Sequence, residues 1–379
     1  MKGIKTTIAA AAALLAAGAA QAEPVKVGMI TTLSGGGAGL GIDARDGFML
    51  AVKQANNPDL EVVIEDDQRK PDIAVQLADK MIQQDKVDVL TGIIWSNLAM
   101  AVVPSAVAQD KFYLSVNAAP SQLAGKGCNK NYFSVSYQND NLHEAAGGYA
   151  SSAGYNSAFI LAPNYPAGKD SLSGFKRFFL GDITDEVYTK LGQTDYAAEI
   201  AQIRASGAES VFFFLPGGMG IAFMKQYAQS GVDIPLIGPA FSMDQGILGA
   251  VGDDALGFKN TSNWSKDIDN ATNKAFVETF QAEYGRLPSL YASYGFDTAN
   301  LLLSAMDKAS VSDADAFRDA LRAADFNSVR GKFIFGPNQH PIQDIYVREV
   351  VKEGDVLTNK IIGTALTDHS DAYASECSM

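Results

Sequence analysis

The chain has 379 residues, of which 47% are hydrophobic, and its 30 Lys and Arg against 43 Asp and Glu give a formal net charge of −13. Such acidity argues against nucleic acid or anionic lipid as a partner, and the length predicts two lobes rather than one small core. Two cysteines and three scattered histidines, without an H-E-x-x-H motif, argue against a metal centre.

The N-terminus has the pattern of a cleaved export signal. Lys2 and Lys5 precede an apolar run over residues 8–20, and Ala20-Gln21-Ala22 forms a cleavage site before Glu23. We therefore expect a signal peptide over 1–22 and an exported mature chain. The run is too short to span a membrane, and no other apolar stretch is long enough to cross a bilayer.

The two cysteines are far apart in the sequence. In an oxidising compartment, a lone pair of cysteines is typical of a disulfide rather than a metal site. We expect Cys128 and Cys377 to be bonded, which would attach the C-terminal tail to the loop that follows Asn117.

From Val25 the chain alternates strand and helix. Short apolar runs rich in β-branched residues predict strands, and apolar residues at helical spacing predict helices between them. We expect strands at 25–33, 60–66, 87–90 and 112–116, and helices through 48–52, from 71 to 82 and after 96. Pro104 indicates that the third of these helices begins or kinks there. Repeated βα units of this kind predict a parallel sheet with helices on both faces.

The stretch 86–121 gives the first indication of a binding site. Its two loops, 92–97 and 117–121, should leave the carboxyl edge of the sheet side by side, where open α/β sheets bind ligands. Ser96 or Asn97 can cap the helix, and a hydroxyl beside free amides at a helix N-terminus can bind a carboxylate. Trp95 would supply a flat apolar wall. An ordinary capped helix with a core tryptophan is the open alternative.

A second βα series follows residues 132–140. We expect helices at 143–152, 169–179, 195–205 and 218–229, and strands at 156–163, 186–191, 210–216, 234–241 and 255–264. Two successive helices, 270–284 and 291–308, then break the alternation and predict a return to the first lobe. A helix at 312–324 and strands at 332–335, 345–351 and 360–366 complete the chain. Crossings near Ser136, Trp264 and Val347 would leave a hinged cleft between two lobes.

Motifs for cofactors and catalysis are absent from the sequence. The glycine-rich segment 34–41 fails the G-x-G-x-x-G pattern at Leu40, and there is no G-x-x-x-x-G-K-[ST] or G-x-S-x-G motif. We expect no cofactor. His143 is the one plausible base for a serine hydrolase, but a histidine in this position is more typical of a helix surface or a backbone cap. The prediction is a protein that is not an enzyme.

Aromatic residues recur at the predicted carboxyl ends of strands. They are Trp95, Tyr165, Phe214, Phe241 and Trp264. Each alone is more often a packing residue, but their shared position favours a cleft for a flat apolar molecule with one anionic end.

Over nearly its whole mature length the chain resembles the periplasmic solute-binding proteins of ABC importers, of the Leu/Ile/Val-binding type. The resemblance rests on the order and spacing of five segments, at 31–56, 64–92, 96–106, 195–213 and 294–302. It implies a type I fold of two Rossmann-like α/β lobes joined by three crossover segments, no catalysis, and delivery of a ligand to an inner-membrane permease. The segments NYPAGKD and FLPGGMG are similar to a subgroup associated with aromatic acids.

The resemblance also assigns site positions. The family's carboxylate-binding serine corresponds to Ser96, and its ligand-stacking tyrosine to Tyr165. The loop that holds the amino acid corresponds to Asn117, Ala118 and Ala119, with alanine in place of a threonine. The acid that pairs with the ligand ammonium corresponds to Ala240 or Phe241, and a tyrosine of the first loop to Leu40. Unless Asp170, Asp244 or Asp297 compensates, an enclosed ammonium group would have no partner.

Together these observations predict a monomeric periplasmic binding protein for a small, aromatic carboxylate. Ser96 and loop amides would hold the anion, Asn97 and Asn117 would orient polar substituents, and the aromatic side chains would enclose the body. We expect an N-terminal lobe of 23–136 plus 265–346 and a C-terminal lobe of 137–264 plus 347–379. Alternatives are a branched-chain amino acid or amide as the ligand, an exported hydrolase, or a ligand-sensing partner of a membrane receptor.

Overall fold

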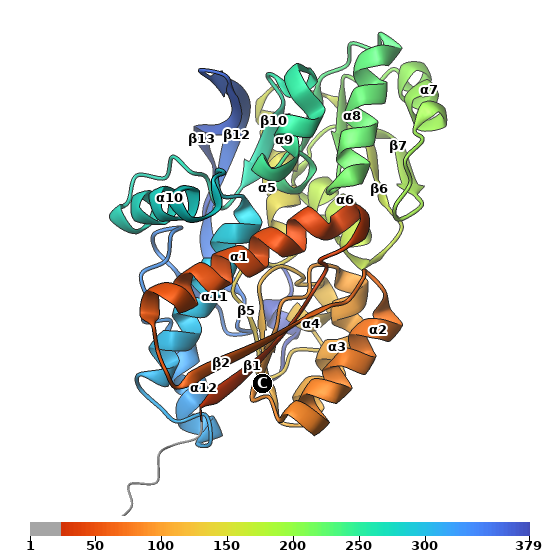
Figure 1. Cartoon of the computed structure of the whole chain (residues 1–379). Helices are drawn as coiled ribbons and strands as arrows, with labels where there is room; N and C mark the ends of the chain where they lie inside the picture. The colour runs from red at the N-terminus through yellow and green to blue at the C-terminus, as the bar shows by residue number, and fades with distance from the viewer. Residues whose placement is uncertain (1–23) are drawn as a thin grey trace, which may run out of the picture.

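The computed structural model describes residues 24–379 and has two α/β lobes, drawn one above the other in Figure 1. The predicted fold class is confirmed, because each lobe has a largely parallel sheet with helices against it. The signal peptide predicted over 1–22 lies outside the described residues. Within them, no helix is both long enough and apolar enough to cross a membrane.

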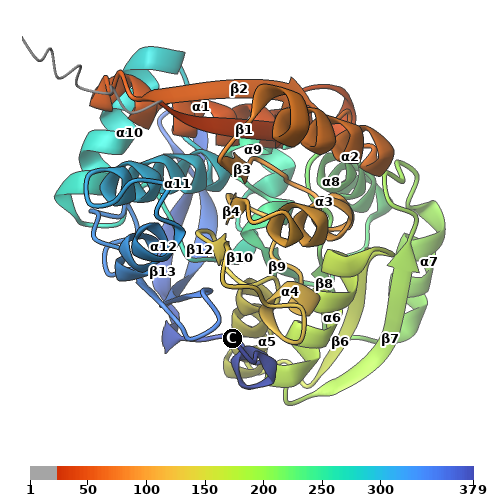
Figure 2. The same ribbon diagram turned by 90° about the horizontal axis from the view of Figure 1, so that it is seen from below.

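The sheet of the first lobe has five parallel strands in the order β2-β1-β3-β4-β5, of which β2, β1, β3 and β4 are labelled in Figure 2. Their bounds are β1 Val25–Thr31, β2 Leu60–Asp66, β3 Val89–Thr91, β4 Phe112–Ser115 and β5 Tyr132–Ser134. Val27 of β1 pairs with Val62 and Val89, and the central strands β3 and β4 are buried on both faces. Continuous apolar runs suit this position, which is why the sequence predicted these strands.

The helices around this sheet include two that are distant in sequence but packed together, α1 and α11 (Figure 1). The helices here are α1 Ala38–Ala55, α2 Pro71–Lys80, α3 Ser96–Ala108, α4 Ser121–Ala124, α10 Ala271–Tyr284, α11 Leu290–Met306 and α12 Ala314–Ala323. A Cβ added to Gly47 of α1 would lie 1.9 Å from the Ala292 carbonyl oxygen, and one added to Gly295 would lie 2.0 Å from that of Ala44. Glycine at both positions therefore permits the close approach, and the predicted return to the first lobe is confirmed.

The sheet of the second lobe has eight strands, with β11-β12-β10-β9-β8-β6-β7 in order and β13 paired to β12. Their bounds are β6 Ser157–Pro163, β7 Asp182–Thr189, β8 Ser210–Phe213, β9 Leu236–Pro239, β10 Lys259–Ser262, β11 Ile334–Phe335, β12 Pro341–Glu353 and β13 Val356–His369. The helices are α5 Asn141–Ser152, α6 Pro166–Phe178, α7 Ala197–Ser206, α8 Gly218–Ser230 and α9 Gln245–Val251. The short helices α4 and α9 were not predicted.

Three segments that join the lobes converge on one backbone oxygen. The Ser136 carbonyl accepts hydrogen bonds from Asn263 Nδ2 (2.9 Å), Gln343 Nε2 (3.1 Å) and Arg330 Nη1 (2.6 Å). Arg330 also donates to the Val135 carbonyl. Ser136 and Asn263 lie at or beside two of the predicted crossings, whereas the third was predicted near Val347, which lies further along β12 than Gln343 and pairs with Thr261 of β10. The exact lobe boundaries stay a prediction.

The predicted disulfide between Cys128 and Cys377 is confirmed, with a Cα–Cα distance of 5.7 Å. It closes a loop with a sequence separation of 249 residues. Long loops lose the most entropy in the unfolded chain when they are crosslinked.

Replacing both cysteines by serine is expected to lower the free energy of unfolding by about 2–5 kcal/mol, because the unfolded chain regains the entropy of the long loop. Urea unfolding of the double variant, alongside the wild-type protein with and without reductant, measures this. Reduced wild-type protein should match the variant. Equal stability of the oxidised and reduced wild-type protein would contradict the prediction.

Candidate ligand-binding site

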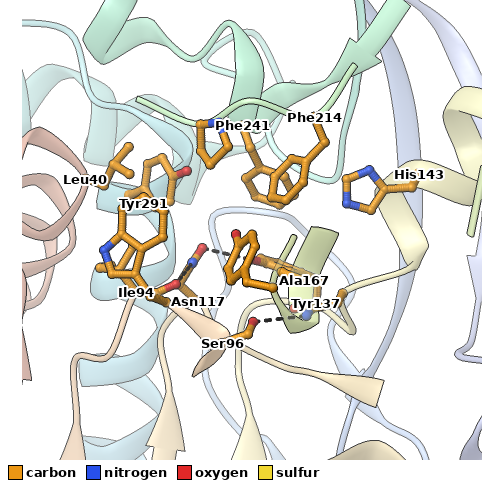
Figure 3. A pocket seen from close by; sticks show the side chains of 14 residues that line it. Leu40, Ile94, Ser96, Asn117, Tyr137, His143, Ala167, Phe214, Phe241 and Tyr291 are labelled. Atoms are coloured by element: carbon orange, nitrogen blue, oxygen red, sulfur yellow. Dashed lines mark hydrogen bonds between the residues drawn. The ribbon is translucent and has the colours of Figure 1, made fainter. Parts of the chain in front are cut away.

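A narrow pocket lies between the two lobes, and residues of both contribute to its wall (Figure 3). It is lined by Leu40, Ile94, Trp95, Ser96, Asn117, Tyr137, Asn139, His143, Tyr165, Ala167, Phe214, Pro216, Phe241 and Tyr291.

Seven of the ten residues predicted as ligand contacts line this pocket. They are Leu40, Trp95, Ser96, Asn117, Tyr165, Phe214 and Phe241. The structure differs from expectation at Asn97, Ala118 and Ala119, which lie outside the lining. The Ala118 amide donates to the Ile93 carbonyl (3.4 Å) and the Ala119 amide to Asn139 Oδ1 (3.1 Å), so both amides are already bonded within the protein.

Ser96 does not cap its helix, and neither does Asn97. The N-cap residue of α3 is Trp95, in extended conformation, and Ser96 is the first helical residue. Pro104 lies inside α3, so the helix does not begin there. Because the first amides of an α-helix have no acceptor within the helix, those of Ser96 and Asn97 remain at the positive end of the helix dipole.

The Ser96 hydroxyl is held by a network that the sequence did not reveal. Asn139 Nδ2 donates to Ser96 Oγ (3.1 Å) and to Asp170 Oδ2 (2.9 Å). Since Ser96 Oγ accepts from Asn139, its own proton is available to a ligand. Asp170 also accepts from the amide (3.0 Å) and the hydroxyl (2.7 Å) of Ser121, which fixes the far end of the network.

A second helix begins at the same pocket. Ala167, which lines it, follows Pro166 at the start of the 13-residue helix α6. Proline suits this first position because no hydrogen bond is lost there. The N-termini of α3 and α6 therefore both lie at the pocket, and their dipoles favour an anion.

Aromatic rings form most of the remaining wall. The rings of Tyr165 and Phe214 are nearly parallel, with an interplanar angle of 14° and centroids 6.3 Å apart. Trp95 lies 6.3 Å from Tyr165, and Phe241 lies 5.9 Å from Phe214 between centroids. The indole of Trp95 is fixed by a hydrogen bond from Nε1 to Thr32 Oγ1 (3.1 Å). Rigid rings of this kind bind flat apolar groups.

Asn117 is held in place by its neighbours (Figure 3). Its Nδ2 donates to the Ile94 carbonyl (2.7 Å), and its Oδ1 accepts from the Tyr137 hydroxyl (2.8 Å). Tyr137 and Asn139 were missed because they follow β5 in a segment that the sequence indicated only as a crossing. Both residues are held by contacts with segments distant in sequence, to Asn117 and Ser96, which local sequence does not reveal.

Within residues 24–379, the pocket wall contains no acidic, lysine or arginine side chain. The three acids that could have compensated are engaged elsewhere. Asp170 bonds Ser121 and Asn139, Asp297 pairs with Arg330 (3.0 Å), and Asp244 accepts from the Leu290 amide (3.2 Å). Trp264, the remaining aromatic residue named from the sequence, also lies outside the wall, with its indole nitrogen donating to Asn273 Oδ1 (2.8 Å).

His143 lies in the pocket wall and is only 1% exposed, so the expected helix-surface position is wrong. Its Nδ1 lies 3.1 Å from Ser171 Oγ. Burial lowers the pKa of His143 to about 3. The imidazole is therefore neutral across the neutral pH range.

The buried imidazole predicts a loss of stability in acid. In the unfolded chain His143 takes up a proton below pH 6.5, whereas in the folded protein its pKa is about 3. Stability contributed by the neutral side chain is thus present above pH 6.5 and is lost as the pH falls toward 3. Between pH 6.5 and 4.5 the wild-type protein should lose about 2–3 kcal/mol more than His143→Leu, as measured by urea unfolding. Equal losses would contradict this prediction.

Comparison with known proteins assigns the fold to a family. A family model described as periplasmic binding protein matches residues 24–355. The chain belongs to the periplasmic binding protein family. This binding protein is 29% identical to the Leu/Ile/Val-binding protein homolog 6 of Brucella melitensis biotype 1, over 94% of each chain. The resemblance inferred from the sequence is confirmed.

Two solved structures of solute-binding proteins of ABC transporters are similar to this binding protein. One, from R. palustris in complex with benzoate, is 30% identical with a TM-score of 0.89, over 94% of this chain and 100% of that one. The other, from Rhodopseudomonas palustris BisB5 in complex with 3,4-dihydroxy benzoic acid, is 28% identical with a TM-score of 0.84, over 92% and 99%. The type I fold is thereby confirmed.

Proposed function

We propose that this protein is the periplasmic substrate-binding component of an ABC importer and that it captures a small aromatic carboxylate between its lobes. The observation that carries this proposal is the composition of the pocket. The donors are the Ser96 hydroxyl and the N-termini of α3 and α6. Aromatic rings form most of the remaining wall, and no charged side chain is present among the described lining residues.

The carboxylate would be bound by Ser96 and by the N-termini of α3 and α6. The Ser96 hydroxyl can donate a hydrogen bond to the ligand, because its oxygen already accepts one from Asn139. A hydrogen bond to a charged group contributes about 1.5–3 kcal/mol, and a helix N-terminus adds to it. Asn97, predicted as a polar contact, would act only through its backbone amide.

The body of the ligand would lie among Trp95, Tyr165, Phe214 and Phe241. Benzoate and 3,4-dihydroxybenzoic acid in the two similar structures support an aromatic acid. The name of the Brucella relative supports the alternative, a branched-chain amino acid or amide. The absence of an acidic side chain from the described pocket wall argues against an amino acid as the ligand, since enclosing an unpaired ammonium group costs several kcal/mol.

A hydrolytic role is less consistent with the structure. The serine beside His143 is Ser171, which is fully buried and outside the pocket wall, so a substrate could not reach it. With a pKa of about 3, His143 would also be a weak base near neutral pH. We therefore propose no catalysis. Export through the signal peptide at 1–22, a monomer, and delivery to an inner-membrane permease complete the proposal.

A thermal-shift screen of small carboxylates tests this function. A ligand at a hundred times its dissociation constant adds about 2.7 kcal/mol of stability. We expect benzoate or a hydroxycinnamate to raise the melting temperature and leucine to leave it unchanged. Ser96→Ala should reduce the response to the aromatic acid. A response to leucine without any response to aromatic acids would overturn the proposal.

A further inference from the structure

His143 is a polar side chain of the pocket that binding of a carboxylate does not account for, and it lies among aromatic rings. His143 lies against Phe214 (centroids 5.0 Å apart, edge-to-face) and Phe241 (6.0 Å). In Figure 3 its imidazole is beside Phe214, on the side of the pocket away from Leu40 and Tyr291. A purely apolar ligand would leave this group without a partner.

The hydrogen bonding of the imidazole determines what it can offer a ligand. Nδ1 is occupied by Ser171 Oγ at 3.1 Å, and no residue in 24–379 bonds Nε2. If the Ser171 hydroxyl donates to Nδ1, then Nε2 carries the proton and donates; in the other tautomer Nε2 accepts. A phenolic hydroxyl both donates and accepts, so it can bond Nε2 in either tautomer.

We propose that His143 Nε2 binds a hydroxyl group on the ligand ring and thereby selects hydroxylated aromatic acids over their unsubstituted analogues. This inference rests on the proposed function and goes beyond it, because it names the substituent and the side chain that recognises it. A site built around a hydrogen bond rejects a ligand that lacks the partner, since the enclosed polar atom then stays unpaired.

Tyr291 supplies the competing explanation. Its hydroxyl also has no hydrogen-bond partner within 24–379, and in Figure 3 it lies near Leu40, opposite His143. A ligand hydroxyl that reached Tyr291 instead would give the same preference in the wild-type protein. The variant Tyr291→Phe, which removes one oxygen and keeps the ring, therefore serves as the matched control.

Calorimetric titration of the mature protein with benzoate, 3-hydroxybenzoate and 4-hydroxybenzoate tests the inference. We expect the better hydroxybenzoate to bind at least about tenfold tighter than benzoate. In His143→Phe this ratio should fall to near one, because the hydroxybenzoate loses its partner and benzoate no longer leaves Nε2 unpaired. His143→Gln should retain part of the preference, and Tyr291→Phe all of it. Thermal melts establish that each variant is folded. If His143→Phe does not fold, His143→Gln becomes the deciding variant.

Three results would overturn the inference. They are a wild-type ratio near one, a ratio that survives both substitutions of His143, and a ratio that is lost in Tyr291→Phe. Each leaves the proposed function intact as long as benzoate binds. Absence of binding by all three acids would reject the proposed function itself, and the inference with it.

Discussion

Replacing Arg330 by alanine is expected to lower the free energy of unfolding by about 3–5 kcal/mol, the largest effect on stability that we predict for one substitution. Arg330 is buried, and its Nε lies 3.0 Å from Asp297 Oδ2, whose side chain is fully buried. Removing the guanidinium leaves the carboxylate uncompensated. Asp297 would keep only the hydroxyl of Ser328 (2.6 Å) and the amide of Val329 (3.0 Å) as partners.

The same substitution acts on the junction between the lobes. Arg330 donates to the carbonyls of Val135 and Ser136 and to Gln343 Oε1 (3.0 Å). Without it, the Ser136 carbonyl keeps Asn263 and Gln343 as donors. We therefore expect weaker ligand binding in addition to the loss of stability, because the pocket forms only when the lobes are correctly placed.

Urea unfolding of Arg330→Ala measures the effect on stability. Arg204→Ala is the matched control, because Arg204 is exposed and, among residues 24–379, its side chain bonds only the Ser230 carbonyl. Its unfolding free energy should stay within about 0.5 kcal/mol of the wild-type value. If both variants were equally stable, the buried pair would not have the role described.

Replacing Ser96 by aspartate is expected to weaken binding of an aromatic carboxylate by about a thousandfold or more. The change removes the hydroxyl donor and places a second negative charge at the position where the ligand anion binds. The new carboxylate can still accept from Asn139, which now donates to Ser96 Oγ, so the fold should persist. Calorimetry on the folded variant measures the loss.

Ser105→Asp is the matched control for this prediction. Ser105 is an exposed residue of the same helix, α3, and it lies outside the pocket wall. Its affinity for the ligand should stay within about threefold of the wild-type value, since exposed charges are screened by solvent. A similar loss in both variants would mean that total charge, rather than the anion position at Ser96, governs binding.

The fold could be predicted from local sequence because buried parallel strands and amphipathic helices leave strong patterns. The two successive helices after residue 270 indicated the return to the first lobe, and α11 does pack on α1. The short α9 was missed because seven residues give too few turns for a helical period to be seen.

Six of the 14 lining residues could be predicted from their position, because the carboxyl ends of parallel strands share one edge of a sheet, and Leu40 only from the family resemblance. The places of Asn139 and His143 in the pocket could not be predicted, because their burial depends on contacts with residues distant in sequence. The C-terminal tail covers α5, where His369 bonds Glu144 and the Tyr373 hydroxyl bonds Asp140 (2.8 Å). Local sequence there is polar and is typical of an exposed helix, so it predicts the wrong environment.

Titration of the ligand-free mature protein with benzoate and with leucine, by calorimetry under one set of conditions, tests the central claim most directly. The claim is that the cleft holds an acid whose other end has no positive charge. We predict measurable heat and saturable one-to-one binding for the aromatic acid, and leucine at least about a hundredfold weaker because its ammonium group finds no acidic partner. Tight binding of leucine, with no heat from the aromatic acid, would contradict the account.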